Sequence, residues 1–147
     1  MFSAFMPMPG CAVASVFTTS PWSGGADTGT PRAVISRFVD LLYRQRMVRA
    51  AFESCVIGAG YRDHVVGGFR GRSQAIRELS RKLGEGGISV LVQHLAIDND
   101  IGMVHLAVRR TADAEPEHRV EIFRVANGRI VEHWGVADPT ANIQDTP

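Results

Sequence analysis

The hydrophobic pattern changes its period once along the chain, at the glycine-rich stretch 84–87. Before this stretch apolar residues recur every three or four positions, which is the spacing of an amphipathic helix. After it they alternate with polar residues, which is the spacing of a strand with one buried face. Helices followed by a run of strands predict an α+β domain in which helices cover one face of a curved sheet.

The helical part is predicted to begin at Thr30-Pro31, because threonine caps helices and proline is favoured at the first helical position. Apolar residues keep a helical spacing from there to about Val56, with a break expected near Arg46-Met47. A short extended piece is expected over 61–64. A second helix is predicted over 71–83, where the following glycines end it.

Four strands are predicted after the glycine-rich stretch, and Asn127-Gly128 is the strongest hairpin signal among their connections. A two-residue loop there pairs Ala126 with Arg129 and, if the register continues unbroken, places Glu121 opposite Trp134. An earlier turn is expected around Asp98-Asn99-Asp100. The predicted strands are 89–97, 101–110, 118–126 and 129–137.

Alternation along the closing hairpin sorts its side chains between two faces of the sheet. A loop centred at Asp113 or Ala114 would put His105 opposite Glu121 or Phe123, and therefore on the face of Glu121. One face is expected to carry Glu121, Phe123, Val125, Ile130, Glu132 and Trp134, and the other Ile122, Arg124, Val131 and His133.

The segment 120–134 resembles the closing hairpin of the SnoaL-like polyketide cyclase family, within the NTF2-like superfamily. The likeness consists of an acidic residue, Ile-Phe-Arg, a glycine turn and then Ile-Val-Glu-His-Trp. Tyr61 and His64, followed by Gly71, match the family's Tyr-x-x-His and glycine spacing. The resemblance covers about residues 30–138 and implies an NTF2-like cone, in which a curved antiparallel or mixed sheet wraps around N-terminal helices. The chain departs from the family pattern at Gly135, where relatives carry an acidic residue.

The resemblance also implies a site. It indicates that the face with Glu121 and Trp134 lines a pocket for a small apolar molecule, and that Glu121 occupies the position of a catalytic acid or base. Tyr61, His64, Phe123 and Trp134 are then the candidate substrate-binding residues. His105 is the candidate catalytic companion, since a histidine next to a carboxylate can tune or orient a base.

From the residues alone, a purely structural role also remains open for both Glu121 and His105. Glu121 fits a cross-strand ion pair with an arginine such as Arg109 or Arg110, and His105 fits a half-buried histidine with an ordinary hydrogen bond. Two functions therefore remain. One is a cofactor-independent acid–base enzyme, with cyclase, isomerase or aldol-type chemistry on an apolar carbonyl or polyketide-like compound. The other is a non-catalytic ligand-binding or dimerisation module.

Composition excludes several other classes. A formal charge of +1 with scattered arginines gives no basic stripe for nucleic acid. No HxH, HExxH or CxxC pattern predicts a metal, and no GxGxxG or GxxxxGK[ST] motif predicts a nucleotide cofactor. No stretch approaches the roughly eighteen apolar residues of a membrane helix, and no basic residue precedes Arg32 as a signal peptide would require, so a cytoplasmic location is expected.

The ends of the chain lack periodicity. Residues 1–29 are expected to be a disordered leader, with a signal or a misassigned start as the alternatives, and 141–147 a flexible tail, leaving 30–140 as the domain. Within that domain the outer face of the sheet, with Ile122, Val131 and His133, is expected to expose apolar area, and a homodimer is predicted to cover it.

Overall fold

The computed structural model describes residues 29–84 and 86–137, so the segments expected to be a leader and a tail lie outside the described residues, apart from Gly29. Apart from a two-residue strand at 62–63, helices come first and strands follow, as the change of period predicts. The helical elements are α1 (Pro31–Val39), the π-helix η1 (Asp40–Arg44), α2 (Val48–Cys55) and α3 (Arg72–Gly84). The strands are β1 (Arg62–Asp63), β2 (Ser89–Asp98), β3 (Ile101–Arg109), β4 (Glu117–Ala126) and β5 (Arg129–Ala137).

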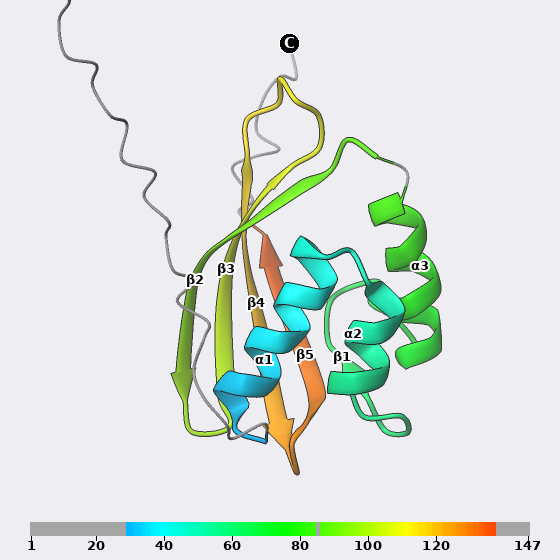
Figure 1. The fold of residues 1–147 in the computed structure, drawn as a ribbon, viewed down its shortest axis with the longest axis vertical. Helices are drawn as coiled ribbons and strands as arrows, with labels where there is room; N and C mark the ends of the chain where they lie inside the picture. Colours follow the sequence, from blue (N-terminus) through cyan, green and yellow to red (C-terminus); the bar gives the residue numbers. More distant parts are fainter. Residues whose placement is uncertain (1–28, 85, 138–147) are drawn as a thin grey trace, which may run out of the picture.

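The five strands form one mixed sheet in the order β1-β5-β4-β3-β2. Neighbours among β2 to β5 run antiparallel, whereas the short β1 runs parallel to β5. The sheet is strongly twisted, and α1 lies across it, with α2 beside α1 and α3 beside α2 (Figure 1). The predicted α+β class and the curved sheet around N-terminal helices are confirmed.

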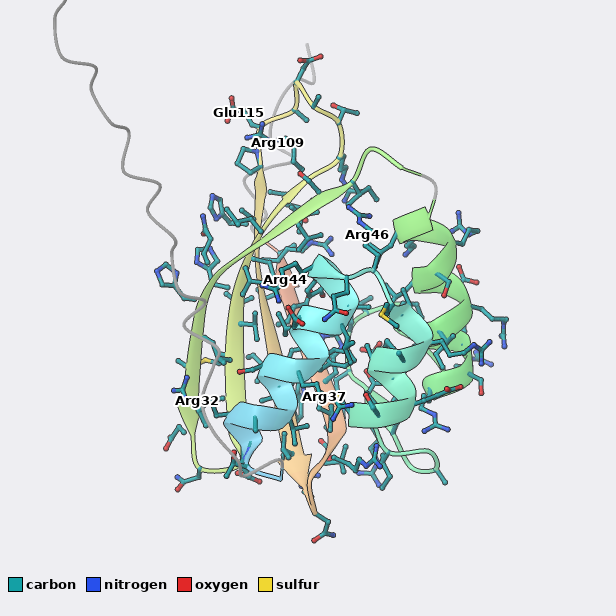
Figure 2. The ribbon with its side chains drawn as sticks, in the orientation of Figure 1. Arg32, Arg37, Arg44, Arg46, Arg109 and Glu115 are labelled. Carbon is teal, nitrogen blue, oxygen red and sulfur yellow. The ribbon has the colours of Figure 1, made fainter. Side chains whose placement is uncertain are left out.

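The helical segment begins and breaks where the sequence predicts. The Thr30 hydroxyl accepts a hydrogen bond from the Ala33 N–H at 3.3 Å, and Pro31 takes the first helical position. The break occurs at Arg46, whose φ of 56° lies in the left-handed region. Its guanidinium lies beside the C-terminal end of α3 (Figure 2) and donates to the Leu83 carbonyl at 2.9 Å and to the Ile88 carbonyl. A cation at that position satisfies carbonyls that a helix end leaves unpaired.

The core lies between the helices and the inner face of the sheet. Phe38 of α1 packs edge-to-face against Phe52 of α2 and Phe123 of β4, with ring centroids 5.2 and 5.5 Å apart. Gly102 of β3 lets α1 approach, because a Cβ atom there would lie 2.3 Å from the Cδ1 atom of Ile35. Apolar burial of this kind is the main favourable contribution to the stability of the fold.

Two β-bulges change which residues face the core. The β4–β5 hairpin begins with the predicted pair Ala126–Arg129, but Val131 is an extra residue on β5, so Glu132 pairs with Arg124. Beyond this bulge every β5 side chain points to the face opposite to the predicted one. In the β2–β3 hairpin Gln93 is the extra residue.

Candidate functional site

Three ionisable side chains meet on the inner face of the sheet: Glu121 of β4, His133 of β5 and Asp63 of β1. The Nε2 atom of His133 contacts Oε2 of Glu121, and its Nδ1 atom lies 3.2 Å from Oδ1 of Asp63. All three side chains are largely buried, with 11%, 15% and 1% of their surfaces exposed respectively. The imidazole therefore bridges two carboxylates that come from distant parts of the chain.

Asp63 is held in place by hydrogen bonds to both of its carboxylate oxygens. Besides its contact with His133, Oδ1 accepts a hydrogen bond from the Val65 N–H, and Oδ2 accepts one from the Phe69 N–H, both at 3.1 Å. Burial alone would raise the pKa of Asp63, but the hydrogen bonds from His133 and the two backbone groups outweigh burial and hold the pKa below its usual range. Asp63 is therefore an ionised anchor with both oxygens engaged.

His133 carries a positive charge at neutral pH. Burial alone would lower its pKa, but its hydrogen bonds to Asp63 and Glu121, together with their negative charges, raise the pKa to about 9. An imidazolium donates from both ring nitrogens, so it satisfies both carboxylates at once.

Glu121 differs from Asp63 because only one of its two carboxylate oxygens has a partner among the described residues. Its Oε2 atom contacts His133, whereas Oε1 makes no hydrogen bond with any described residue. No fully buried side-chain oxygen among residues 29–84 and 86–137 lacks a partner, so Oε1 retains accessible surface. Gly135 pairs with Glu121, and a Cβ atom there would lie 2.9 Å from Oε2. The missing side chain at Gly135 thus makes room for the carboxylate.

Two tyrosine hydroxyls feel the negative charge of this carboxylate. Tyr43 lies on η1, and Tyr61 precedes β1 and packs edge-to-face on Phe52 with ring centroids 6.3 Å apart. Burial raises the pKa of both hydroxyls well above the usual range, and the negative charge of Glu121 adds to the shift. Neither hydroxyl forms a hydrogen bond with another described residue. Because no fully buried side-chain oxygen among these residues lacks a partner, both hydroxyls retain accessible surface. Both remain protonated hydrogen-bond donors.

The predicted inward face is correct for Glu121 and Phe123, which precede the bulge. Phe123 is 3% exposed and stacks on the ring of His133 with centroids 5.0 Å apart. The alternative ion pair of Glu121 with Arg109 or Arg110 is wrong. The partner of Glu121 is His133, since Arg110 pairs with Glu117.

The predicted position of His105 beside Glu121 is wrong. In the β3–β4 pairing Glu121 lies opposite Val104, and His105 lies opposite Val120. The pairing is offset by one residue from the predicted register, and such an offset moves a side chain to the other face. His105 therefore points outward, where it contacts His94 and His118.

Trp134 and His64 also lie on the outer face, contrary to the prediction that they line the pocket with Glu121. Trp134 pairs with Ile122 and stacks on the ring of His64 at 4.7 Å, with the two planes 6° apart. His64 contacts Glu132 at 3.1 Å, and Glu132 also binds Arg124. The Val131 bulge explains the exchange of Trp134 for His133. No local signal in the sequence marks that bulge.

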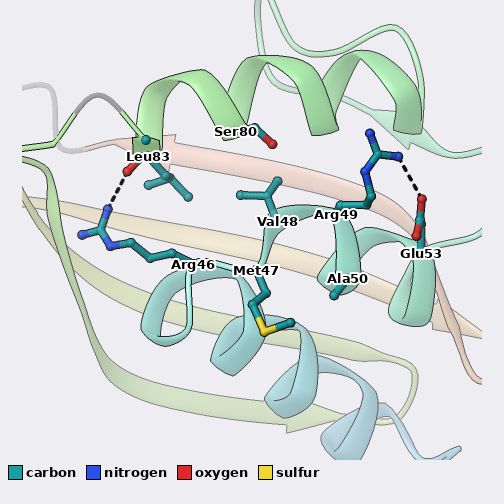
Figure 3. A pocket seen from close by; sticks show the side chains of 9 residues that line it. Arg46, Met47, Val48, Arg49, Ala50, Glu53, Ser80 and Leu83 are labelled. Atoms are coloured by element: carbon teal, nitrogen blue, oxygen red, sulfur yellow. Dashed lines mark hydrogen bonds and ion pairs between the residues drawn. The ribbon is translucent and has the colours of Figure 1, made fainter.

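Two cavities within the described residues lie away from the Glu121 carboxylate. A cavity of about 180 Å³ lies between η1 and β2, and Tyr43 forms part of its wall together with Asp40 and Val92. A larger open groove of about 700 Å³ lies between α2 and α3 (Figure 3). Arg46 and the Arg49–Glu53 ion pair border this groove. Of the two, only the first includes a side chain whose pKa responds to Glu121.

Neither a metal centre nor a membrane span is found in the described part of the chain. Within residues 29–84 and 86–137, no group of three or more His, Cys, Asp or Glu side chains is arranged to hold a metal ion. Across the same residues, no helix has both the length and the apolar character to cross a membrane.

Comparison with known proteins identifies the fold. No protein-family model matches the chain, and no curated protein matches it. Solved structures do match. An NTF2-like protein of unknown function from Cytophaga hutchinsonii superposes with a TM-score of 0.60 at 12% identity, over 76% of this chain and 92% of that one.

Two further matches are described as candidate polyketide cyclases. The one from Bacillus cereus has a TM-score of 0.58 at 16% identity, over 76% of each chain. The SnoaL-like one from Jannaschia sp. CCS1 has a TM-score of 0.57 at 18% identity, over 84% of this chain and 99% of that one. The chain therefore has the NTF2-like fold, with similarity to SnoaL-like cyclase structures.

Proposed function

We propose that this protein is a cofactor-independent acid–base enzyme that acts on a small apolar carbonyl compound, with cyclase, isomerase or aldol-type chemistry. The observation that carries the proposal is the unequal use of two buried carboxylates. Asp63 has both oxygens engaged, whereas Glu121 keeps Oε1 without a partner among the described residues. A catalytic base needs one held oxygen for orientation and one available oxygen for the proton.

The chemical step follows from these positions. Oε1 of Glu121 removes a proton from the carbon next to the substrate carbonyl, and the C–H electron pair moves into an enolate. The enolate oxygen accepts a hydrogen bond from the hydroxyl of Tyr43 or Tyr61, whose raised pKa keeps it protonated. The enolate carbon then attacks an electrophilic carbonyl carbon, whose π electrons move to its oxygen and take the proton back from Glu121, or the enolate takes that proton back at a new position. His133 holds Oε2 and orients the carboxylate throughout.

The substrate class follows from the surroundings of Glu121. Phe123, Phe38 and Val104 lie on or against the same inner face and are buried, so this part of the inner face is largely apolar. Tyr61 and Phe123 remain the candidate substrate contacts. Similar structures include candidate polyketide cyclases, which supports a polyketide-like carbonyl compound as the first class to screen.

Glu121→Gln tests the proposal, because the change is nearly isosteric and removes the base. We expect turnover of a substrate found by screening to fall at least about 100-fold, the usual contribution of general acid–base catalysis. Ligand binding and fold should remain. Glu117→Gln is the matched control, since it makes the same change on the same strand where the carboxylate is held by Arg110 and Arg119. Full activity of Glu121→Gln would refute the assignment.

A second candidate function is a non-catalytic, self-associating module, and a specific observation favours it. The outer face of the sheet exposes Leu91, Met103 and Val136 at 63%, 45% and 61%. Exposed apolar surface of this kind is typical of an interface, so we propose a homodimer formed through this face. Self-association through this face is compatible with either function. Sedimentation that gives a monomer at micromolar concentration would count against the dimer, whereas binding without turnover for every screened carbonyl compound would favour the module.

A further inference from the structure

Three histidines form a continuous hydrogen-bonded chain on the outer face of the sheet. They come from three adjacent strands: His94 from β2, His105 from β3 and His118 from β4. The Nδ1 atoms of His94 and His105 are 3.2 Å apart, and Nε2 of His105 is 2.9 Å from Nδ1 of His118. The ring centroids are 5.4 and 5.1 Å apart. We call these three residues the histidine chain.

The register of the β2–β3 hairpin produces this arrangement. The pairing runs unbroken from Asp98–Ile101 at the turn to His94–His105, and the Gln93 bulge lies beyond these pairs. His118 pairs with Ala107, one step diagonally from His105 on the same face. The three imidazoles thus share one face, although they lie at unrelated positions in the sequence.

The central residue uses both of its ring nitrogens, which limits what the histidine chain can do. A metal ion needs lone pairs that converge on one point, whereas His105 directs different nitrogens to its two neighbours. Protons suit the geometry better. With all three rings neutral, each link has one donor and one acceptor. One extra proton on His105 is also accommodated, because both neighbours can then accept. A second extra proton places two N–H groups against each other in at least one link.

Among the described residues, no carboxylate forms a hydrogen bond or ion pair with the histidine chain that could compensate a second proton. In the described residues the hydrogen bonds of the histidine chain are those within it, and its neighbours in the sheet include Met103, Ala107 and Val120. The other charged or titratable groups on the outer face make their own contacts or lie at its ends, as Arg109 does beside the β3–β4 loop (Figure 2). These groups are Arg62, His64, Asp98, Arg109, Arg124 and Glu132.

The face around the histidine chain is large enough for a second copy of the protein. Four strands about 4.8 Å apart, each about ten residues long at roughly 3.3 Å per residue, span roughly 600 Å². Stable interfaces bury about 600–1,000 Å² on each partner. The charged residues of the face lie toward its margins, and the apolar Leu91, Met103 and Val136 lie on the same face as the histidine chain. This arrangement resembles the apolar centre and polar rim of an interface.

We propose that the histidine chain makes self-association through the outer face dependent on pH. The dimer is stable while the histidine chain of each copy holds at most one extra proton, and the dimer dissociates when more protons are bound. The inference rests on the homodimer proposed above and adds its regulation. Histidine is the side chain that ordinarily changes charge between pH 5 and 8. Covering the histidine chain with apolar surface disfavours its charged forms, so the protein takes up protons when the dimer dissociates. The dissociation constant of the dimer therefore rises as the pH falls.

Sedimentation of the full chain at pH 7.5, 6.5 and 5.5 tests the proposal. Each proton taken up on dissociation changes the dissociation constant about tenfold per pH unit, so we expect at least a tenfold rise between pH 7.5 and 5.5. His105→Gln removes the central ring but keeps a donor and an acceptor, and it should remain dimeric at pH 7.5 with a much smaller pH dependence. His64→Gln is the matched control on the same face, and it should keep the pH dependence.

The outcomes separate the regulation from the dimer. A dissociation constant that is unchanged with pH, or an equally steep dependence in His105→Gln, overturns the regulation and leaves the dimer standing. A monomer at every pH overturns both. Circular dichroism at pH 5.5 should match that at pH 7.5, and loss of the fold at pH 5.5 would also overturn the regulation. The expected result is dissociation of folded protein at pH 5.5 in the wild type and in His64→Gln, and much less dissociation in His105→Gln.

Discussion

Raising the pH from about 6.5 to 9 should destabilise the folded protein mainly through His133. In the folded state its pKa is about 9, against an ordinary value of 6.5, because Asp63 and Glu121 both accept hydrogen bonds from the ring. A group whose pKa is raised by folding contributes its stabilisation fully below the unfolded pKa and loses it as the pH rises through the folded pKa. The free energy of unfolding should therefore fall between about pH 6.5 and pH 9.

The size of the fall follows from the two pKa values. Each tenfold difference in proton affinity is worth about 1.4 kcal/mol, so the preference of the folded state for the charged ring amounts to roughly 3 kcal/mol. His133 is 15% exposed, which leaves little screening by solvent. A loss of this size is a large fraction of the stability of a typical domain, which is about 5–15 kcal/mol.

Urea unfolding at pH 6, 7.5 and 9 measures the effect. Measurements stop at pH 9, because burial raises the pKa values of Cys55, Tyr43 and Tyr61 as well, and these groups add losses of their own at higher pH. His133→Gln keeps a planar polar side chain that does not titrate. Its free energy of unfolding should change little over the same range, although it starts lower at pH 6.

Two results would refute this reasoning. One is a wild-type protein whose free energy of unfolding stays constant from pH 6 to 9, which would mean that the ring is not held as a cation. The other is a His133→Gln variant that loses as much as the wild type, which would place the responsible group elsewhere.

Two further substitutions test the packing. Gly102→Ala should cost about 1–3 kcal/mol, because its Cβ atom would lie 2.3 Å from Cδ1 of Ile35; urea unfolding measures the cost, and adding Ile35→Val, which removes that atom, should recover part of it. Trp134→Ala should cost only about 1 kcal/mol, because the ring stacks on His64 at the outer face, and it should weaken self-association in sedimentation. A loss above about 3 kcal/mol for Trp134→Ala would indicate a core position instead.

The elements of the fold follow from local signals that the sequence carries openly. Thr30-Pro31 starts a helix because the hydroxyl and the fixed proline φ act within one turn. Asn127-Gly128 closes a hairpin because both residues accept a positive φ, and they have φ values of 50° and 69°. Such signals depend on a few neighbouring atoms, and they predicted the helix start and the turn correctly.

The site depends on which face of the sheet each side chain points to, and this is set by the alternation and register of the whole strand. Glu121 and Phe123 face inward as predicted, because they lie on the unbulged strand β4. Valine is not a residue type that indicates a bulge. Yet the extra residue Val131 turns His133 to the inner face of the sheet and Trp134 to the outer face. A prediction that counts alternate residues is correct up to a bulge and inverted beyond it, and for that reason His133 was missed.

The parallel pairing of β1 with β5 has a consequence for the order in which the protein folds. Asp63 reaches His133 through the pair Arg62–Glu132 and Asp63–His133, which joins segments about seventy residues apart. Contacts between segments far apart in the chain form slowly, because the loop between them must close before the contact is gained. The antiparallel hairpins can form locally, whereas the two-residue β1 has to wait for β5. The Asp63–His133 contact should therefore complete late in folding, so substitutions that weaken it should speed unfolding more than they slow folding.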